Sequence, residues 1–326
     1  MLTARTDALP YIEAAVALRG PDYRCRDCGA AVILRRAGRR VAHFAHRPDG
    51  ACGFGGPMSA AHLAAQQVIA AALRARGLGV ELEARLAGDG AARRIDVLAW
   101  PADRPEARVA IEVQASDLTA EGVAMRTAAY QTLGVAPLWL RLLDFGRFPR
   151  VQTLPFRGTI WIERYAARAW ERWAHDHLGG RLWFMDSGTG AVWRGLFVAA
   201  HRHRDRGRIA GDAGETVGRG ADWTEASQWV DLELDGPFGL AEAKLRRATA
   251  RGPDDLARRY AAFAPGGDTG DGLSPDVRVR FQPEPRGVSR VLETRVAGAW
   301  LTTAPEGANA DWRVRRPATR AALTIP

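Results

Sequence analysis

Two short stretches, Arg94-Ile-Asp-Val-Leu-Ala-Trp100 and Arg108-Val-Ala-Ile-Glu-Val-Gln-Ala-Ser116, decide the fold of this chain. Each is a run of β-branched and apolar residues that predicts a buried strand. Each also carries an acidic residue, Asp96 in the first and Glu112 in the second. A buried carboxylate is costly unless it contacts a positive group. Carboxylates on neighbouring strands offer the oxygen ligands that Mg²⁺ prefers, so the sequence predicts a magnesium site on a sheet.

The segments around these strands predict an α/β layer sandwich with a mixed central sheet. Residues 59–76 and 119–133 are predicted helices, because Ser59 and Thr119 are good N-caps and a glycine follows each segment. Four predicted strands complete the core, over residues 80–86, 94–100, 108–114 and 137–143. The order is helix, strand, strand, strand, helix, strand.

The predicted acidic site extends beyond the two carboxylates. Alternate side chains of a strand share a face, so Gln114 is expected beside Glu112. Glu83, or alternatively Glu81, can extend the metal shell from the preceding strand, and Glu83 is favoured because it lies nearer the strand centre. A metal held by Asp96 and Glu112 would activate water and stabilise a scissile phosphate. The competing interpretation is a row of solvated carboxylates on an edge strand.

A cluster of cysteines and histidines near the N-terminus predicts a structural Zn²⁺ site. Cys25 and Cys28 form a Cys-x-x-Cys pair, and His43, His46 and Cys52 follow. Tetrahedral zinc takes four such ligands, and spacing does not decide which four of the five bind. A module of this size needs a metal to replace the hydrophobic core that it lacks. Free cysteines and surface histidines are the alternative.

Composition sets wider expectations. The chain has 326 residues and a net charge of +9, which makes DNA a plausible partner. Only Lys244 among its 46 basic residues is lysine, so coding bias is an equal explanation of the charge. Three clustered cysteines do not suggest a secreted disulfide scaffold. Neither a signal peptide nor a membrane span is evident, so we expect a cytoplasmic protein.

Several of these motifs together resemble the competence protein CoiA-like family. They are Glu112-Val-Gln-Ala-Ser116, Arg126-Thr-Ala-Ala-Tyr130, Leu138-Trp-Leu140 and the upstream cysteine and histidine cluster. The resemblance implies a restriction-endonuclease-like three-layer core of the PD-(D/E)XK type behind a zinc-finger-like module. It also implies catalytic roles for Asp96, Glu112 and Gln114 in handling incoming DNA. The chain departs from the family at Gln66, where the acidic and lysine positions around His62 are lost.

The resemblance leaves alternatives for function. His62 contacts a phosphate or the attacking water, or else is satisfied within helix–sheet packing. The whole chain is a Mg²⁺-dependent deoxyribonuclease, or a DNA-binding protein of the same fold with weakened catalysis. A third alternative is a scaffold within a recombination complex. Proteins of recombination or DNA uptake are the further partners that we expect.

Four regions are expected. Residues 1–56 hold N-terminal strands and the zinc-finger-like module, and residues 57–148 hold the nuclease core. Residues 149–264 are expected to be mixed and mainly helical, with helices at 159–178, 239–249 and 254–263 and a hairpin of 182–185 with 192–198. Residues 265–326 form a weakly patterned tail that contains two candidate strands, 277–281 and 291–296.

Overall fold

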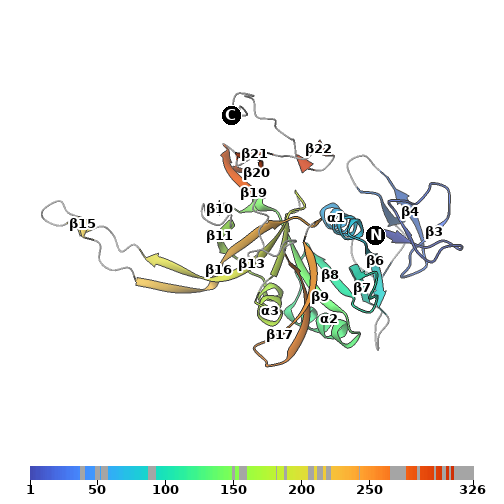
Figure 1. Cartoon of the computed structure of the whole chain (residues 1–326), viewed down its shortest axis with the longest axis horizontal. Coiled ribbons are helices and arrows are strands. Elements are labelled where there is room, and N and C mark those ends of the chain that lie inside the picture. Colours follow the sequence, from blue (N-terminus) through green and yellow to red (C-terminus); the bar gives the residue numbers. More distant parts are fainter. Residues whose placement is uncertain are drawn as a thin grey trace.

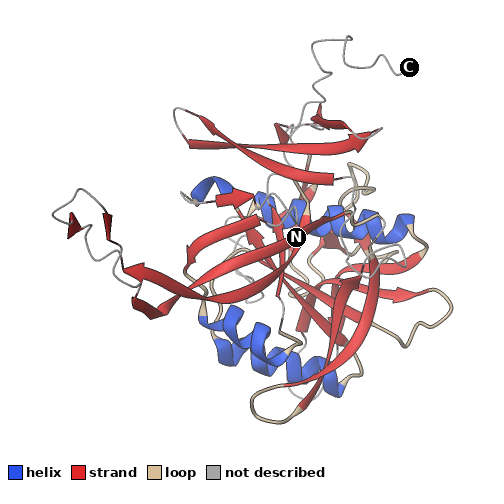
Figure 2. Ribbon diagram, turned by 60° about the vertical axis from the view of Figure 1, so that its left-hand side comes forward, coloured by secondary structure: helices blue, strands red, loops and turns tan. Residues whose placement is uncertain are grey.

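A mixed β-sheet with helices on both faces forms the centre of the molecule (Figures 1 and 2). The computed structural model describes residues 1–36, 41–47, 52, 58–86, 93–148, 151–153, 160–180, 182–186, 189–204, 209–210, 216–217, 222–241, 243–264, 277–284, 287–296, 299–302, 306–307 and 310–311. Within them the central sheet has nine strands, in the order β10-β11-β16-β13-β12-β9-β8-β7-β6. Their bounds are β6 (Leu78–Leu86), β7 (Arg93–Pro101), β8 (Val109–Gln114), β9 (Ala136–Leu143), β10 (Val151–Thr153), β11 (Ile160–Tyr165), β12 (Leu182–Asp186), β13 (Val192–Arg204) and β16 (Asp222–Phe238).

The middle of this sheet is its most deeply buried part. β8 runs parallel to β9, and β9 runs parallel to β12, whereas the outer pairs are antiparallel. Every residue of β8 and β9 is buried. Parallel strands covered on both faces usually consist of apolar residues throughout. Glu112 in β8 and Arg141 in β9 are the charged exceptions. The α/β prediction with a mixed central sheet is confirmed.

The two predicted core helices form close to their predicted limits. α1 (Ala60–Ala75) begins where the Ser59 side chain accepts a hydrogen bond from the His62 backbone N–H. α2 (Ala120–Thr132) begins in the same way at Thr119. Each helix is followed by a glycine with positive φ, 77° at Gly77 and 71° at Gly134, a conformation that favours glycine.

The helices cover opposite faces of the sheet and so complete the three layers. α1 buries Leu63, Ile69 and Leu73 against residues of β6, β7 and β8 in one core cluster. α3 (Ala169–His177) buries Trp170 in a second cluster that also holds Val123 of α2. A 3₁₀ turn, η1 (Phe145–Arg147), follows β9 and adds Phe145 to this second cluster.

The N-terminal module is joined to the core by ion pairs. It contains two small sheets, β1 (Thr3–Ala4) with β2 (Ile12–Glu13) and β3 (Tyr23–Arg24) with β4 (Ala31–Arg35) and β5 (His43–His46). Asp27, in the turn after β3, accepts hydrogen bonds from Arg85 of β6 at 2.9 Å and Arg94 of β7 at 3.4 Å. The neighbouring Arg26 bonds to Glu81 of β6 at 2.9 Å. The module therefore rests on the same edge of the sheet that carries Asp96.

The expectation of a mainly helical region over 149–264 is wrong for the described residues. There, α3 is the one α-helix, and the predicted helices at 239–249 and 254–263 are instead a β-hairpin of β17 (Lys244–Arg251) and β18 (Ala257–Ala264). Alanine and arginine favour a helix locally, but pairing across the hairpin places Leu245 opposite Phe263 over the core. Tertiary burial overrides local propensity here.

The remaining C-terminal strands agree better with expectation. β12 and β13 form the predicted antiparallel hairpin, and β19 (Val277–Glu284) and β20 (Gly287–Val296) contain the two candidate strands of the tail. Figure 1 shows β13 and β16 continuing outward as a two-stranded ribbon. The shorter strands are β14 (Ile209–Ala210), β15 (Thr216–Val217), β21 (Ala299–Thr302), β22 (Glu306–Gly307) and β23 (Ala310–Asp311).

Replacing Arg85 should loosen the N-terminal module from the sheet. Arg85→Ala removes two hydrogen bonds from the Asp27 carboxylate, whose side chain is only 7% exposed. Because Arg85 itself is 33% exposed, we expect a loss of about 1–2 kcal/mol in the free energy of unfolding. Chemical denaturation measures this loss. Arg104→Ala is the matched control, since Arg104 pairs with Asp103 in solvent, and an equal loss in both variants would contradict the joining role.

Candidate functional site

Asp96 lies where β7 separates from β8. The two strands pair at Val97–Ala99 with Val109–Ile111. Beyond this pairing, the Asp96 side chain rather than the β7 backbone contacts β8. Its Oδ2 accepts a hydrogen bond from the backbone N–H of Val113 at 2.9 Å. The residue is 8% exposed. A carboxylate therefore occupies a position where a regular ladder would place a backbone carbonyl.

Two residues of α1 complete the surroundings of Asp96. Gln66 donates from Nε2 to Asp96 Oδ1 at 2.7 Å, and its Oε1 is buried without a hydrogen-bond partner among the described residues. His62 Nε2 lies 3.2 Å from the same Oδ1. Burial lowers the pKa of His62, but the hydrogen bond to Asp96 and the charges of Asp96 and Glu112 outweigh it and raise the pKa overall. The Nε2 of Gln66, which can only donate, lies 2.8 Å from the same His62 Nε2.

Glu112 is completely buried in β8, and its carboxylate contacts α2. Oε2 accepts a hydrogen bond from Arg126 Nη2 at 2.5 Å, and Oε1 accepts one from the Tyr130 hydroxyl. The Arg126 guanidinium lies over the ring of Trp139, 5.3 Å from its centroid. Burial raises the pKa of Glu112 to about 7, with Asp96 adding to the rise and Arg126 opposing it. This carboxyl group therefore titrates near neutral pH.

Gln114 brings no charge, but a buried arginine lies beside it. In the parallel register Gln114 faces Arg141 of β9, which donates to the Gln114 carbonyl oxygen at 3.3 Å. Arg141 also pairs with the fully buried Glu171 of α3 at 3.1 Å, and Tyr165 donates to the same carboxylate. Our sequence reasoning overlooked Arg141. The signal was available, because a single charge interrupts the apolar run Leu138–Leu143.

Glu83 of β6 contacts the N-terminal module. Its Oε2 accepts hydrogen bonds from the backbone N–H and the hydroxyl of Thr3, at 3.0 and 2.8 Å. Glu83 has a positive φ of 48°, and the β6–β7 register omits the Glu83 and Asp96 positions. Across this irregularity the strands change face, since Leu82 packs under α1 whereas Ala84 packs with Tyr130. The regular alternation assumed from sequence does not hold here.

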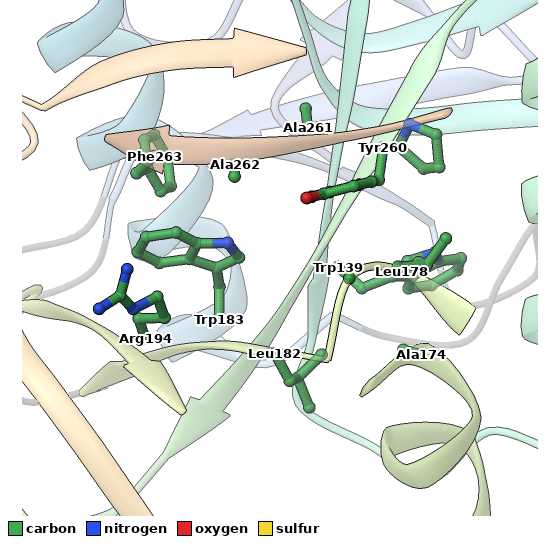
Figure 3. A pocket seen from close by; sticks show the side chains of 12 residues that line it. Trp139, Ala174, Leu178, Leu182, Trp183, Arg194, Tyr260, Ala261, Ala262 and Phe263 are labelled. Atoms are coloured by element: carbon green, nitrogen blue, oxygen red, sulfur yellow. The ribbon is translucent and has the colours of Figure 1, made fainter. Parts of the chain in front are cut away.

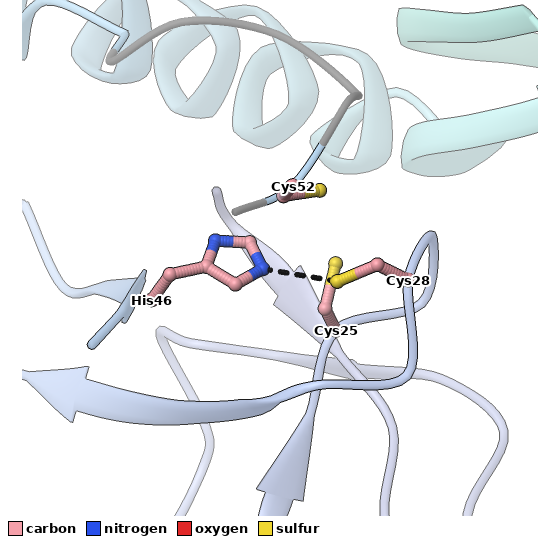
Figure 4. Close-up of side chains that lie close together, drawn as sticks. All are labelled: Cys25, Cys28, His46 and Cys52. Carbon is pink, nitrogen blue, oxygen red and sulfur yellow. Dashed lines mark hydrogen bonds between the residues drawn. The ribbon is translucent and has the colours of Figure 1, made fainter. Parts of the chain in front are cut away.

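Four of the five predicted zinc ligands converge. The ligand atoms of Cys25, Cys28, His46 and Cys52 all lie within 4.8 Å of one another (Figure 4). Cys28 Sγ and His46 Nε2 are 3.4 Å apart. Three thiols and one imidazole are the donor types of a structural tetrahedral zinc site, so the cluster can bind a metal such as zinc. His43 is outside the cluster, and its Nδ1 lies 3.0 Å from the carbonyl oxygen of Val41.

The carboxylates of the acidic site are not gathered as tightly. In the part of the chain that the structure describes, only the cysteine and histidine cluster brings three or more potential metal ligands together in this way. His62, Asp96 and Glu112 are adjacent but do not form such a group. Asp96 is held by α1 and β8, while Glu112 is held by α2.

Two protein-family models match this chain, and each match covers one of the two sites. Residues 12–55 match the family model described as competence protein CoiA, N-terminal domain, and residues 59–153 match competence protein CoiA, nuclease-like domain. Residues 12–153 therefore resemble CoiA in both its N-terminal and its nuclease-like domain. All four converging zinc ligands fall within the first CoiA match, and the residues from His62 to Gln114 fall within the second.

The CoiA resemblance inferred from the motifs is confirmed by these matches. No curated protein and no solved structure gave a significant match. Residues beyond 153 lie outside both CoiA matches. Among the described residues, no helix is long and apolar enough to cross a membrane.

Zinc content tests the ligand set. Purified protein should contain about one zinc per chain, and Cys28→Ser or His46→Ala should lower this content strongly, because a structural site loses its closed tetrahedral shell. Elemental analysis by mass spectrometry gives the metal-to-protein ratio. His43→Ala is the matched control and should keep its zinc. Loss of metal in His43→Ala with retention in His46→Ala would reverse the assignment.

Proposed function

We propose that this CoiA-like protein is a Mg²⁺-dependent deoxyribonuclease in which Asp96 and Glu112 hold the metal. The observation that supports this most directly is the placing of two buried carboxylates at the opening between β7 and β8, within the segment that matches the nuclease-like domain. Buried negative groups with only partial neutralisation favour a divalent cation. The donor atoms are oxygens, which fits Mg²⁺.

The residues around the metal have distinct roles in this proposal. When bound, Mg²⁺ supplies Lewis-acid stabilisation of the scissile phosphate and of the attacking water. The backbone N–H of Val113 and the amide of Gln66 fix the orientation of Asp96. A protonated His62 beside Asp96 can donate a hydrogen bond to a phosphate oxygen. Gln114 can orient water through its amide. Glu83 is proposed for stability rather than for the metal shell, given its bonds to Thr3.

Weakened catalysis is the second candidate function, and one specific observation favours it. Arg126 and Tyr130 already bond to both oxygens of Glu112, so a metal has to compete with a protein cation. The site would then retain DNA through Arg126 and His62 without efficient cleavage. DNA uptake or recombination as the pathway, partners from those complexes and a cytoplasmic location remain parts of this proposal.

A cleavage assay with Asp96→Ala separates the two candidates. If the protein is a nuclease, this variant should lose Mg²⁺-dependent cleavage by about a hundredfold or more, because a metal ligand is removed. DNA binding should remain, since phosphate contacts come mainly from cationic side chains. Gel-based cleavage of linear, circular, single- and double-stranded DNA measures the first property, and binding without added divalent metal measures the second. Asp103→Ala, at a residue whose side chain is 78% exposed, is the matched control.

Wild-type protein that binds DNA but never cuts it with Mg²⁺ or Mn²⁺ would support the second candidate. Weak DNA binding that is insensitive to salt would instead favour a scaffold, because phosphate contacts make affinity fall steeply with salt.

Metal binding should strengthen as the pH rises through about 7. The pKa of Glu112 is raised to that value by burial, so below it the carboxyl group is protonated and a metal must displace the proton. Calorimetric titration with Mn²⁺ in buffers of different ionisation enthalpy measures both affinity and proton release. Glu112→Gln should flatten this pH dependence. A wild-type affinity independent of pH over the same range would argue against Glu112 as a ligand.

A further inference from the structure

A cavity of about 240 Å³ is lined by residues of β9, β12, β13 and β18, and none of them is a proposed metal ligand. β18 crosses over it, and Trp183 of β12 and Leu178 after α3 form its opposite walls (Figure 3). Four of its twelve lining residues are aromatic, namely Trp139, Trp183, Tyr260 and Phe263. Trp183 and Phe263 meet edge to face, with ring centroids 5.2 Å apart. The space is therefore bounded by flat, rigid surfaces.

Polar atoms of the lining are left without protein partners. The Tyr260 hydroxyl has no hydrogen-bond partner within the described residues, and Figure 3 shows it directed toward the middle of the cavity. Arg194 bonds to Asp235 through Nη2 at 2.8 Å, but its Nε is buried without a hydrogen-bond partner among those residues. The nitrogen of Trp183 also faces inward in Figure 3. The guanidinium and the indole only donate, so the cavity suits a flat ligand that carries acceptors.

The hairpin that closes the cavity is strongly basic. Within residues 243–264 there are six cationic residues, and the acidic residues are Asp254 and Asp255 in the turn. Those two acids pair with Arg258 and Arg251. Lys244, Arg246, Arg247 and Arg259 are exposed along the strands, which leaves cationic groups beside the cavity for an anionic ligand.

The cavity is also linked to the acidic site through one residue. Trp139 lines the cavity, and Arg126, which bonds to Glu112, lies over the same indole ring. In the sheet register Trp139 faces Glu112 directly. Only the Trp139 indole and the Arg126 guanidinium therefore lie between a ligand in the cavity and the Glu112 carboxylate.

We propose that this cavity binds a nucleobase, with the attached phosphate held by the basic hairpin β17–β18. Aromatic walls provide stacking, the donors of Arg194, Trp183 and Tyr260 meet the ring acceptors of the base, and the exposed cations attract the phosphate. The proposal rests on the proposed function only in taking nucleic acid as the partner. It requires neither Mg²⁺ nor cleavage, so it fails or survives separately from the nuclease.

The test compares a short single-stranded oligonucleotide with an abasic strand of the same length, in buffer without added Mg²⁺, by fluorescence anisotropy. Wild-type protein should bind the base-bearing strand at least about fivefold more tightly, since stacking of one base provides that much. Ala262→Leu fills the cavity from β18 and should bring the affinity ratio close to one without weakening abasic binding. Ala250→Leu, on β17 and outside the cavity lining, is the matched control and should keep the wild-type ratio.

Equal wild-type affinity for the two strands, or an unchanged ratio in Ala262→Leu, would overturn the proposal. If thermal unfolding shows that Ala262→Leu does not fold, Tyr260→Phe replaces it in the test. This variant removes only the hydroxyl that donates to the base, so the affinity ratio should fall, and an unchanged ratio would contradict the proposal. Competition by deoxynucleoside 5′-monophosphates, but not by deoxyribose 5-phosphate, would identify a free nucleotide as the ligand. Competition by the oligonucleotide alone would identify a base within a strand. Asp96→Ala should retain the ratio, which separates this site from a failure of the nuclease.

Discussion

The hydrogen bond between the Asp96 carboxylate and the Val113 backbone N–H is the constraint on which the acidic site depends. The bond forms where the backbones of β7 and β8 stop pairing. The two strands that carry Asp96 and Glu112 are therefore not joined by backbone pairing at this end. A side chain that replaces a backbone acceptor cannot move without exposing a buried donor, which costs about 1–3 kcal/mol. The position of Asp96 is therefore fixed by the fold itself. Gln66, an apparent loss when judged by the family pattern, has a clear structural role because it bonds to the same carboxylate.

The N-terminal module and the core are coupled through charges and through one buried apolar residue, Leu2, which belongs to the core cluster of α1. Most of the other buried apolar residues of the module form their own cluster around Tyr23 and Phe44, and ionic contacts of Arg26 and Asp27 reach the edge strands. Both residues lie inside the Cys25–Cys28 turn. A metal in the cluster would fix that turn and therefore the two side chains that contact β6 and β7. The zinc-finger-like module thus has a structural reason to sit beside the nuclease-like core.

Some of the basic residues of this chain are paired internally. Arg126, Arg141 and Arg194 each pair with an acidic residue in or near the core, so the number of basic residues overstates the cations available to a polyanion. The hairpin β17–β18 is different, because most of its cations are exposed. This contrast makes the C-terminal half, which lies outside the CoiA matches, a candidate for contacts with nucleic acid in its own right.

Local signals in the sequence predicted the core. Capping residues, glycine stops and apolar runs identified α1, α2 and the strands β6 to β9, because these signals act over a few neighbouring residues. The zinc ligands were identified as a set of five for a similar reason, since their spacing is local. The hairpin β17–β18 was missed because its strands are stabilised by Leu245 and Phe263 packing on distant residues, against their helical propensity.

The pairing of the polar groups follows from tertiary packing and was not predicted. Alternation along a strand placed Glu83 with Asp96, but the irregularity in β6 turned its side chain toward Thr3. The same structure placed Arg126 and Tyr130 on Glu112 and separated His43 from the other ligands. A sequence specifies which faces of a helix or strand are apolar, because the spacing of apolar residues along the chain shows which face is buried. It does not specify which buried charge meets which, because that depends on how strands and helices distant in the chain are packed together.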